Sequence, residues 1–199
     1  MILDSESMPQ ETKELFLDHV YTSHMQCLVS ALELPISPLS TLNAQYQALE
    51  LLSFCVSQHA WRVRQFVLQH EVMQKAVRLL ALGDQELTCA VLRFLRACIA
   101  LKEDAYAKRI VAQKLLDPVV DAFLANGARY NMLNSVVLDL VNFVRQENIK
   151  PLVDYLVSAH EERFKHISYV PTFRLLKTRW EQNQEYLKDG GKDKEAEDI

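Results

Sequence analysis

The sequence predicts an all-α protein, folded as an armadillo or HEAT-like right-handed α-solenoid of about three repeats with flanking helices. Glycine and proline are scarce, at 4 and 6 of 199 residues, which favours long helices over many short strands. Apolar residues recur at helical spacing along most of the chain. A pair of helical patterns also repeats with a period in the forties, which is typical of helical solenoids.

The clearest copy of this pair lies at 129–157, where an almost wholly apolar helical pattern precedes a shorter one. A helix that is apolar around most of its circumference must be covered on more than one side. The same pair recurs at 89–124, with Pro118 matching Pro151, and again at 48–80. Because no copy can bury its own apolar face, the copies are expected to stack.

In chain order, residues 1–10 are polar and predicted to be disordered, and an armadillo-like helical domain is predicted over 11–187. A first helix is expected at 11–34, because Pro35 and Pro38 would stop it. Gly83 should end the first full repeat and Asp84 should cap the helix that follows. The helices expected in that repeat are 43–58, 61–68 and 71–82.

The second repeat should close at Gly127, and in the third the short middle helix is reduced to a turn. Pro118, Pro151 and Pro171 are each expected just inside a helix start, where the missing N–H costs nothing. The last helix carries one narrow apolar stripe, as a terminal cap requires. The charged segment 188–199 is predicted to be disordered. The helices expected in this half are 85–101, 104–113, 115–126, 131–146, 149–160 and 171–187.

Several classes of function find no support. There is no long apolar run and no signal-peptide pattern, so we expect a protein of the nucleus and cytoplasm with no membrane partner. Nor do we expect a nucleic-acid partner. The six histidines form no metal-binding spacing, and neither a nucleophile elbow nor a phosphate-binding glycine loop is present. We therefore predict no enzyme, no metal and no cofactor. The cysteines are expected to be reduced and buried: Cys27, Cys55, Cys89 and Cys98.

Charge is unevenly distributed. Residues 1–60 carry seven acids against Lys13 alone, whereas 61–115 carry ten Lys and Arg against five acids. One interpretation is a solvated surface of alternating charges. The other is a basic groove for acidic or phosphorylated peptide segments of substrates.

Candidate partner-binding residues fall in three groups. Lys75 and Arg78 share a face of the third helix of the first repeat, and both are expected to be exposed. The equivalent helices of armadillo proteins commonly line the peptide-binding face. Arg93 and Arg96 could form a fork for phosphate or carboxylate, or could pair with acids of a neighbouring repeat. The third group could hold a partner's backbone, or its asparagines could cap helices and bond between repeats. Its members are Tyr130, Asn131 and Asn134.

Four segments carry a resemblance to a known family: FLDHVYTSHMQCLVSAL at 16–32, NAQYQALELLSFCV at 43–56, RYNMLNS at 129–135 and YVPTFRLLKTRWEQ at 169–182. Together they closely resemble the central conserved domain of protein phosphatase 4 regulatory subunit 3, the suppressor-of-MEK and falafel family. The sequence departs from that pattern at 34–42 and 69–74.

The resemblance implies a non-catalytic targeting subunit that joins the phosphatase 4 catalytic and scaffold subunits and brings substrates to them. It also implies flanking EVH1-like and acidic regions, so we expect this chain to be part of a longer protein. A generic armadillo adaptor is the alternative that the repeats alone would equally support. Nothing supports a helical enzyme.

Overall fold

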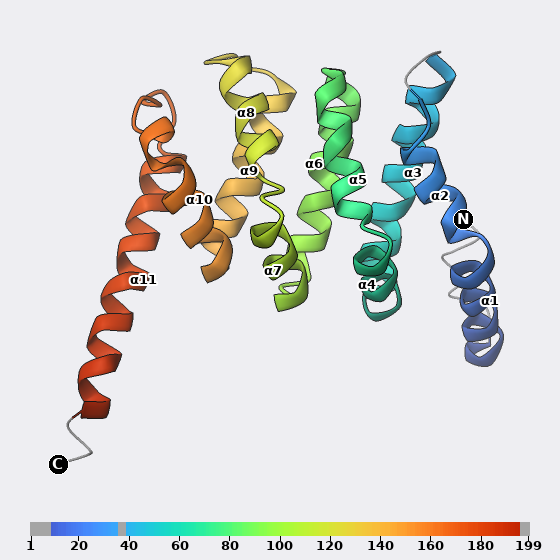
Figure 1. The fold of residues 1–199 in the computed structure, drawn as a ribbon, viewed down its shortest axis with the longest axis horizontal. Coiled ribbons are helices and arrows are strands. Elements are labelled where there is room, and N and C mark those ends of the chain that lie inside the picture. The colour runs from blue at the N-terminus through green and yellow to red at the C-terminus, as the bar shows by residue number, and fades with distance from the viewer. Residues whose placement is uncertain (1–8, 36–38, 196–199) are drawn as a thin grey trace. The chain divides into compact units, whose positions relative to one another are not determined.

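The computed structural model describes residues 9–35 and 39–195, and in these ranges the regular structure is entirely helical (Figure 1). The prediction of an all-α protein is thereby confirmed. Among the described residues, no helix combines the length and the apolar character that crossing a bilayer requires. The right-handed superhelix remains a prediction.

The chain divides into two compact units, Met1–Ala97 and Cys98–Ile199. In the first, α2 packs on α3 and α5, and α1 packs on α4. Large apolar side chains with almost no exposure, among them Leu49, Leu52, Met73 and Leu92, form its core. Its elements are α1 Gln10–Ser23, α2 Met25–Leu32, α3 Leu39–Gln58, α4 Ala60–Gln69, α5 Val72–Arg78, the 3-10 helix Leu79–Leu82 and most of α6 Gln85–Ala100.

In the second unit, α11 packs along α10 and α9, α10 also contacts α7, and α8 packs on α9. Phe123, Leu140 and Leu176 are among its buried residues. The elements are α7 Asp104–Ala112, α8 Asp117–Asn126, α9 Met132–Gln146, α10 Lys150–Phe164 and α11 Thr172–Glu195. The turn at 147–149 stands where the short middle helix of the third repeat was predicted to be lost.

Local sequence signals placed most helix ends correctly. Gly83 adopts a left-handed φ of 68° after the 3-10 helix, and the Asp84 carboxylate accepts the Leu87 N–H at 2.8 Å. Pro118 and Pro151 each occupy the first turn of a helix, α8 and α10 respectively. Glycine suits the helix end because it tolerates positive φ. Proline suits the first turn of a helix because it lacks the N–H that this turn would leave without a hydrogen bond.

Two helix ends share a turn that the sequence did not reveal. After α7, Lys114 has φ 52° and the Leu115 N–H bonds to the Ile110 carbonyl at 3.0 Å. After α9, Asn148 has φ 48° and the Ile149 N–H bonds to the Val144 carbonyl at 3.1 Å. Both are Schellman-type ends. The same type of turn therefore precedes α8 and α10, the two helices in which Pro118 and Pro151 occupy equivalent positions of the sequence pattern.

Four expectations need correction. The helix expected at 11–34 is interrupted at His24, where ψ is −28° and α2 starts anew. Pro171 precedes α11 rather than lying inside it, and its carbonyl accepts the Leu175 N–H. Cys27 is exposed, unlike the other three cysteines. Helix α11 runs to Glu195, eight residues into the segment predicted to be disordered. The predicted disorder at 1–8 and 196–199 lies outside the described residues.

His59, which precedes α4, is almost fully buried in the first unit. Its Nδ1 lies 3.1 Å from the Tyr21 hydroxyl, and the ring meets Tyr21 and Phe54 edge-on. Burial lowers the pKa of His59 below its ordinary value of 6.5, and the positive charges of Lys13 and Arg62 lower it further. The folded protein therefore favours the neutral imidazole.

We expect this histidine to make the first unit less stable in mild acid. Below about pH 6.5 the unfolded chain binds a proton that folded His59 resists, so the free energy of unfolding falls as pH decreases. Urea unfolding of the wild type and of His59→Gln, at about pH 5.5 and pH 7.5, measures the effect. The variant should lose part of the pH dependence, whereas His166→Gln, at an exposed histidine, should not. Equal pH dependence in all three proteins would contradict the assignment.

Candidate functional site

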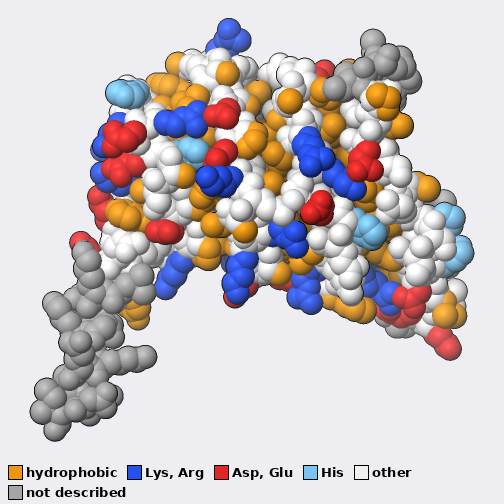
Figure 2. Space-filling model, viewed as in Figure 1, with side chains coloured by type: hydrophobic (Ala, Val, Ile, Leu, Met, Phe, Trp, Pro, Cys, Tyr) orange, Lys and Arg blue, Asp and Glu red, His pale blue; other side chains and the backbone are white. Residues whose placement is uncertain are grey.

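Acidic residues near the start of the chain neutralise part of the basic stretch at 61–115. Arg62 on α4 pairs with Asp18 and Glu14 of α1, and hydrogen bonds to these two carboxylates raise the Arg62 pKa despite the opposing effect of burial. On α5, Lys75 Nζ lies 2.8 Å from Glu33 Oε1. The space-filling view likewise shows acidic and basic side chains interspersed with hydrophobic ones (Figure 2). These observations favour the solvated, alternating surface over a single basic groove.

Lys75 and Arg78 differ in their surroundings. Arg78 is exposed at the last turn of α5, as predicted. The expectation that Lys75 is exposed is wrong, because its side chain is only 19% exposed and is paired with Glu33. Replacing Lys75 by glutamate together with Arg78 would therefore place a carboxylate at position 75 against the carboxylate of Glu33. Arg78→Glu alone is the cleaner test of this face.

Arg93 follows the structural alternative rather than the fork for a ligand. Its Nη2 and Nε lie 2.6 and 3.1 Å from Glu50 Oε1, and its guanidinium lies beside Tyr46, 5.9 Å from the ring centroid. Burial alone would lower the Arg93 pKa, but bonding to Glu50 outweighs it and the pKa is raised. Glu50 lies on α3. Arg96, half-buried, is one turn further along α6.

Asn131 and Asn134 also have structural roles. The Asn131 side chain caps α9 by accepting the Asn134 N–H at 3.1 Å. Asn134, only 4% exposed, donates to the carbonyls of Gly127 and Arg129 at 2.8 and 2.7 Å and accepts from Asn126 at 2.8 Å. The predicted capping is confirmed. These asparagine bonds serve the loop between α8 and α9, and the Asn134 amide is almost fully buried there.

The loop held by these asparagines displays Tyr130. The side chain of Tyr130 is fully exposed, and Met132 at the start of α9 is 63% exposed. Of the three predicted residues in the RYNMLNS segment, Tyr130 is exposed, Asn131 is half-buried and Asn134 is buried.

A polar network of Asp117, Tyr155 and His160 joins α8 to α10. Asp117 accepts a hydrogen bond from the Tyr155 hydroxyl and lies 3.0 Å from His160 Nε2. Burial raises the Tyr155 pKa, and the adjacent carboxylate raises it further. The remaining His160 nitrogen lies 3.4 Å from Arg163. Tyr155 and His160 are buried, the Asp117 side chain is 35% exposed, and the bonds among the three residues hold the two helices together.

A concave site in the second unit lies between α10 and α11. It is a groove of about 580 Å³, within the range of known ligand pockets. Phe164 and Phe173 stack in its floor with ring centroids 4.3 Å apart. The groove is lined by Val157, Glu161, Phe164, Lys165, Ile167, Ser168, Val170, Pro171, Phe173, Arg174 and Lys177. An apolar floor with a few charged groups at its rim suits a side chain of another protein.

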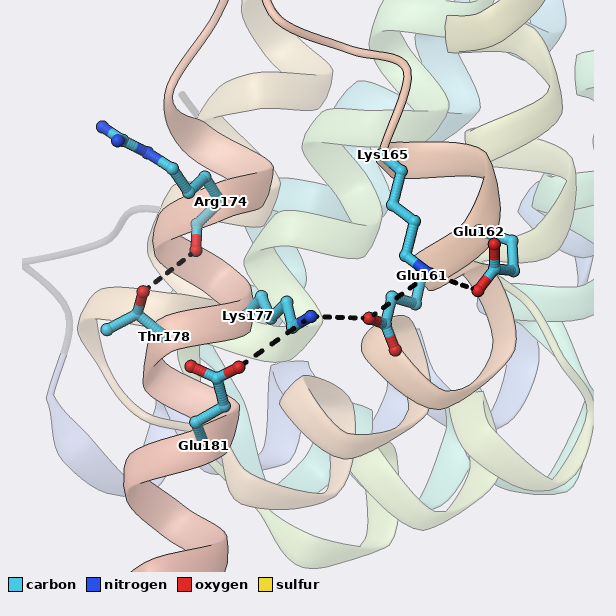
Figure 3. Close-up of polar contacts among 7 residues, drawn as sticks. All are labelled: Glu161, Glu162, Lys165, Arg174, Lys177, Thr178 and Glu181. Carbon is cyan, nitrogen blue, oxygen red and sulfur yellow. Dashed lines mark hydrogen bonds and ion pairs between the residues drawn. The ribbon is translucent and has the colours of Figure 1, made fainter.

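Ion pairs fix the rim of this groove (Figure 3). Lys177 Nζ lies 2.7 Å from Glu161 Oε1 and so links α11 to α10. The hydrogen bond to Lys177 lowers the pKa of Glu161, and the same bond raises the pKa of Lys177. Lys165, at the end of α10, pairs with Glu162 and lies 3.9 Å from Glu161. Glu161 and Lys177 therefore both stay charged at neutral pH.

Arg174 differs from the two lysines. Its guanidinium points away from the Lys177–Glu161 pair (Figure 3), and it makes no ion pair with any residue that the structure describes. The groove lining contains three cations, Lys165, Arg174 and Lys177, and one carboxylate, Glu161. The lining of the groove therefore carries a surplus of positive charge.

Sequence reasoning did not select any groove residue. The spacing of Arg174 and Lys177, three apart on one helix, was a usable signal, but similar pairs occur elsewhere in the chain. The ion pair of Lys177 with Glu161 brings two helices together and was not visible in the pattern. Within the described part of the chain, no group of three or more His, Cys, Asp or Glu side chains is placed to hold a metal ion.

Comparison with known proteins assigns these features to a family. The family model described as phosphatase 4 regulatory subunit 3 matches residues 1–182. A Drosophila melanogaster protein named serine/threonine-protein phosphatase 4 regulatory subunit 3 is 37% identical over 199 residues, covering 96% of this chain and 20% of the fly protein. A Mus musculus protein named Protein PPP4R3C1 is 32% identical over 201 residues, covering 92% of this chain and 25% of the mouse protein.

The chain thus spans a fifth to a quarter of the length of these relatives. No solved structure matches it. The family match extends over the asparagine-held loop and the groove between α10 and α11 alike.

Proposed function

This chain belongs to the phosphatase 4 regulatory subunit 3 family. From that premise we propose that it is the helical part of a non-catalytic regulatory subunit that binds other proteins and brings substrates to phosphatase 4. The family is one of regulatory subunits, not of catalytic chains. The match over residues 1–182 is the observation that carries the proposal. The partners that follow from it are the phosphatase 4 catalytic and scaffold subunits and the substrates that the subunit recruits.

We further propose that the helices form about three armadillo-like repeats in a right-handed solenoid. The sequence period supports this, and so does the Arg93–Glu50 pair, which joins matching helices of successive repeats 43 residues apart. The Schellman-type turns before α8 and α10 add a second correspondence. Such repeats provide long surfaces for binding extended peptides.

Two surfaces are candidates for recruiting substrates. The first is the α5 face with Arg78, as expected from armadillo proteins in general. The second is the groove between α10 and α11, which lies along the third helix of the last repeat. The groove is favoured because it combines an apolar floor with Arg174, which makes no ion pair in the described part of the chain, whereas Lys75 beside Arg78 is paired with Glu33.

Affinity purification tests the proposed function. We expect tagged full-length protein containing this chain to co-purify the phosphatase 4 catalytic and scaffold subunits from cells, and a version lacking residues 9–195 to lose part of its bound substrates. A scaffold protein of unrelated pathways would instead bring down neither phosphatase subunit. Failure to co-purify either subunit would contradict the proposed regulatory role and would favour a generic adaptor.

A further inference from the structure

We propose that the groove between α10 and α11 binds a linear protein segment that carries a bulky apolar side chain next to acidic residues. The inference rests on the proposed function, because it specifies which kind of partner segment the subunit would capture. It is carried by three features of the groove: its floor, its charge and the rigidity of its walls.

The floor is suited to an apolar anchor. Phe164 and Phe173 are 7% and 4% exposed, and the half-buried Ile167 and Val170 continue the apolar lining along the segment that joins the two helices. Burying an apolar side chain contributes about 25 cal/mol for each Å² removed from water. A volume of about 580 Å³ leaves room for one large side chain and its neighbours in an extended chain.

The charge of the rim selects acidic neighbours for that anchor. Lys177 and Lys165 are already engaged with Glu161 and Glu162. Arg174 is exposed and makes no ion pair with any described residue, and its guanidinium, which points away from the Lys177–Glu161 pair (Figure 3), supplies a free donor when its side chain turns toward the groove. A guanidinium presents a planar fork that matches a carboxylate or a phosphate with two parallel hydrogen bonds. We take the group that binds Arg174 to be the carboxylate of an Asp or Glu residue. Binding of a phosphorylated residue instead is an outcome that the experiment can distinguish.

The start of α11 adds to this preference. Phe173 and Arg174 lie in its first turn, whose N–H groups have no acceptor within the helix, and the helix dipole favours negative charge there. The opposite wall holds the negative end of α10, where Lys165 occupies the C-cap position and offsets it. Anionic groups are thus favoured on the α11 side of the groove.

The walls are held before any ligand arrives. The Lys177–Glu161 pair joins the helices on one side, and Trp180 Nε1 donates to Asp154 at 2.8 Å further along. A preformed groove binds a flexible segment with less loss of conformational entropy than one that must first assemble.

Selection from a display library of short random peptides on the immobilised chain tests the proposal. We expect enriched peptides to combine a bulky apolar residue with Asp or Glu, and synthetic labelled copies to bind the wild type in fluorescence anisotropy. Arg174→Glu should raise the Kd of these peptides by about tenfold or more. Ser168→Trp, which places a large side chain at the exposed rim, should also weaken binding. Arg179→Glu makes the same charge change on α11 outside the groove and should have little effect.

Each result has a defined meaning. Affinity that falls with added salt and with Arg174→Glu, but not with Arg179→Glu, supports the groove as the site. Enrichment of peptides without acids, or equal losses from the two arginine variants, would overturn it. Copies in which Ser or Thr is phosphorylated would show, by binding more tightly than Asp or Glu versions, that phosphate is the preferred group and our assignment to carboxylate is wrong.

The outcome is separable from the proposed function. If Arg174→Glu in the full-length protein abolishes peptide binding yet the phosphatase 4 subunits still co-purify, the regulatory role stands and the groove serves recruitment. If the peptides bind the groove but no phosphatase subunit co-purifies, the groove stands and the regulatory role fails.

Discussion

Replacing Phe173 by alanine should lower the free energy of unfolding of the second unit by about 3–5 kcal/mol. Phe173 is 4% exposed and lies between two rings, 4.3 Å from Phe164 and 5.3 Å from Phe123 between centroids. It therefore joins α11 to α10 and α8 at once. Removing the ring leaves a cavity beneath the groove, and packed helices collapse into such a cavity only in part.

Urea unfolding followed by the fluorescence of Trp180 measures this loss, since Trp180 lies on α11 and bonds to Asp154 of α10. A Trp61→Phe background removes the other tryptophan, whose side chain is 66% exposed in the first unit. The matched control is Leu175→Ala on the same helix, at a side chain that is 38% exposed, where a loss below about 1 kcal/mol is expected. Similar losses at both positions would mean that Phe173 does not anchor α11.

Asn134→Asp should destabilise the same unit by about 2–4 kcal/mol at neutral pH. The Asn134 amide donates to the Gly127 and Arg129 carbonyls, at 2.8 and 2.7 Å. A carboxylate of nearly the same shape cannot donate, so two carbonyls lose their partner and face a negative charge in a buried position. The loss should shrink in acid, where the protonated carboxyl regains one donor.

Asn131→Asp is the matched control for this change. Aspartate caps helices as well as asparagine does, so the bond to the Asn134 N–H is kept, and only the 3.3 Å donation to Asn126 is lost. We expect a change within about 0.5 kcal/mol. If the Asn131 variant is as unstable as the Asn134 variant, the loop depends on the cap and not on the buried amide.

The network also bears on binding. If the Asn134 variant remains folded at low temperature, its loop between α8 and α9 should lose order, and amide exchange should quicken at 127–131. The groove between α10 and α11 does not use this loop for its lining. Peptide affinity measured on the folded variant should therefore stay close to that of the wild type.

Much of the secondary structure was predictable from the sequence because its signals are local. Gly83 with Asp84, and Pro118 and Pro151, mark helix ends through bonds and steric limits that span only a few residues. The apolar period identified the helices for the same reason, since residues three and four apart share a helix face. The interruption at His24 carried no glycine or proline and was missed.

The binding residues depended on partners that are distant in the sequence. Lys75 and Arg78 have equal charge on one helix, yet Glu33, which follows α2, pairs with Lys75. Arg93 forms an ion pair with Glu50, and the Asn134 side chain donates a hydrogen bond to the Arg129 carbonyl in the loop between α8 and α9.

By itself, the sequence determined that the chain is helical, where most of its helices begin and end, and which family it resembles. Only the tertiary structure decided which charged side chains remain free: Glu161 on α10 engages Lys177 on α11, 16 residues later, and leaves Arg174 unpaired beside an apolar floor. The physical reason is one of range. Backbone hydrogen bonds and helical periodicity act between near neighbours in the chain, whereas ion pairing and burial depend on which helices meet in space.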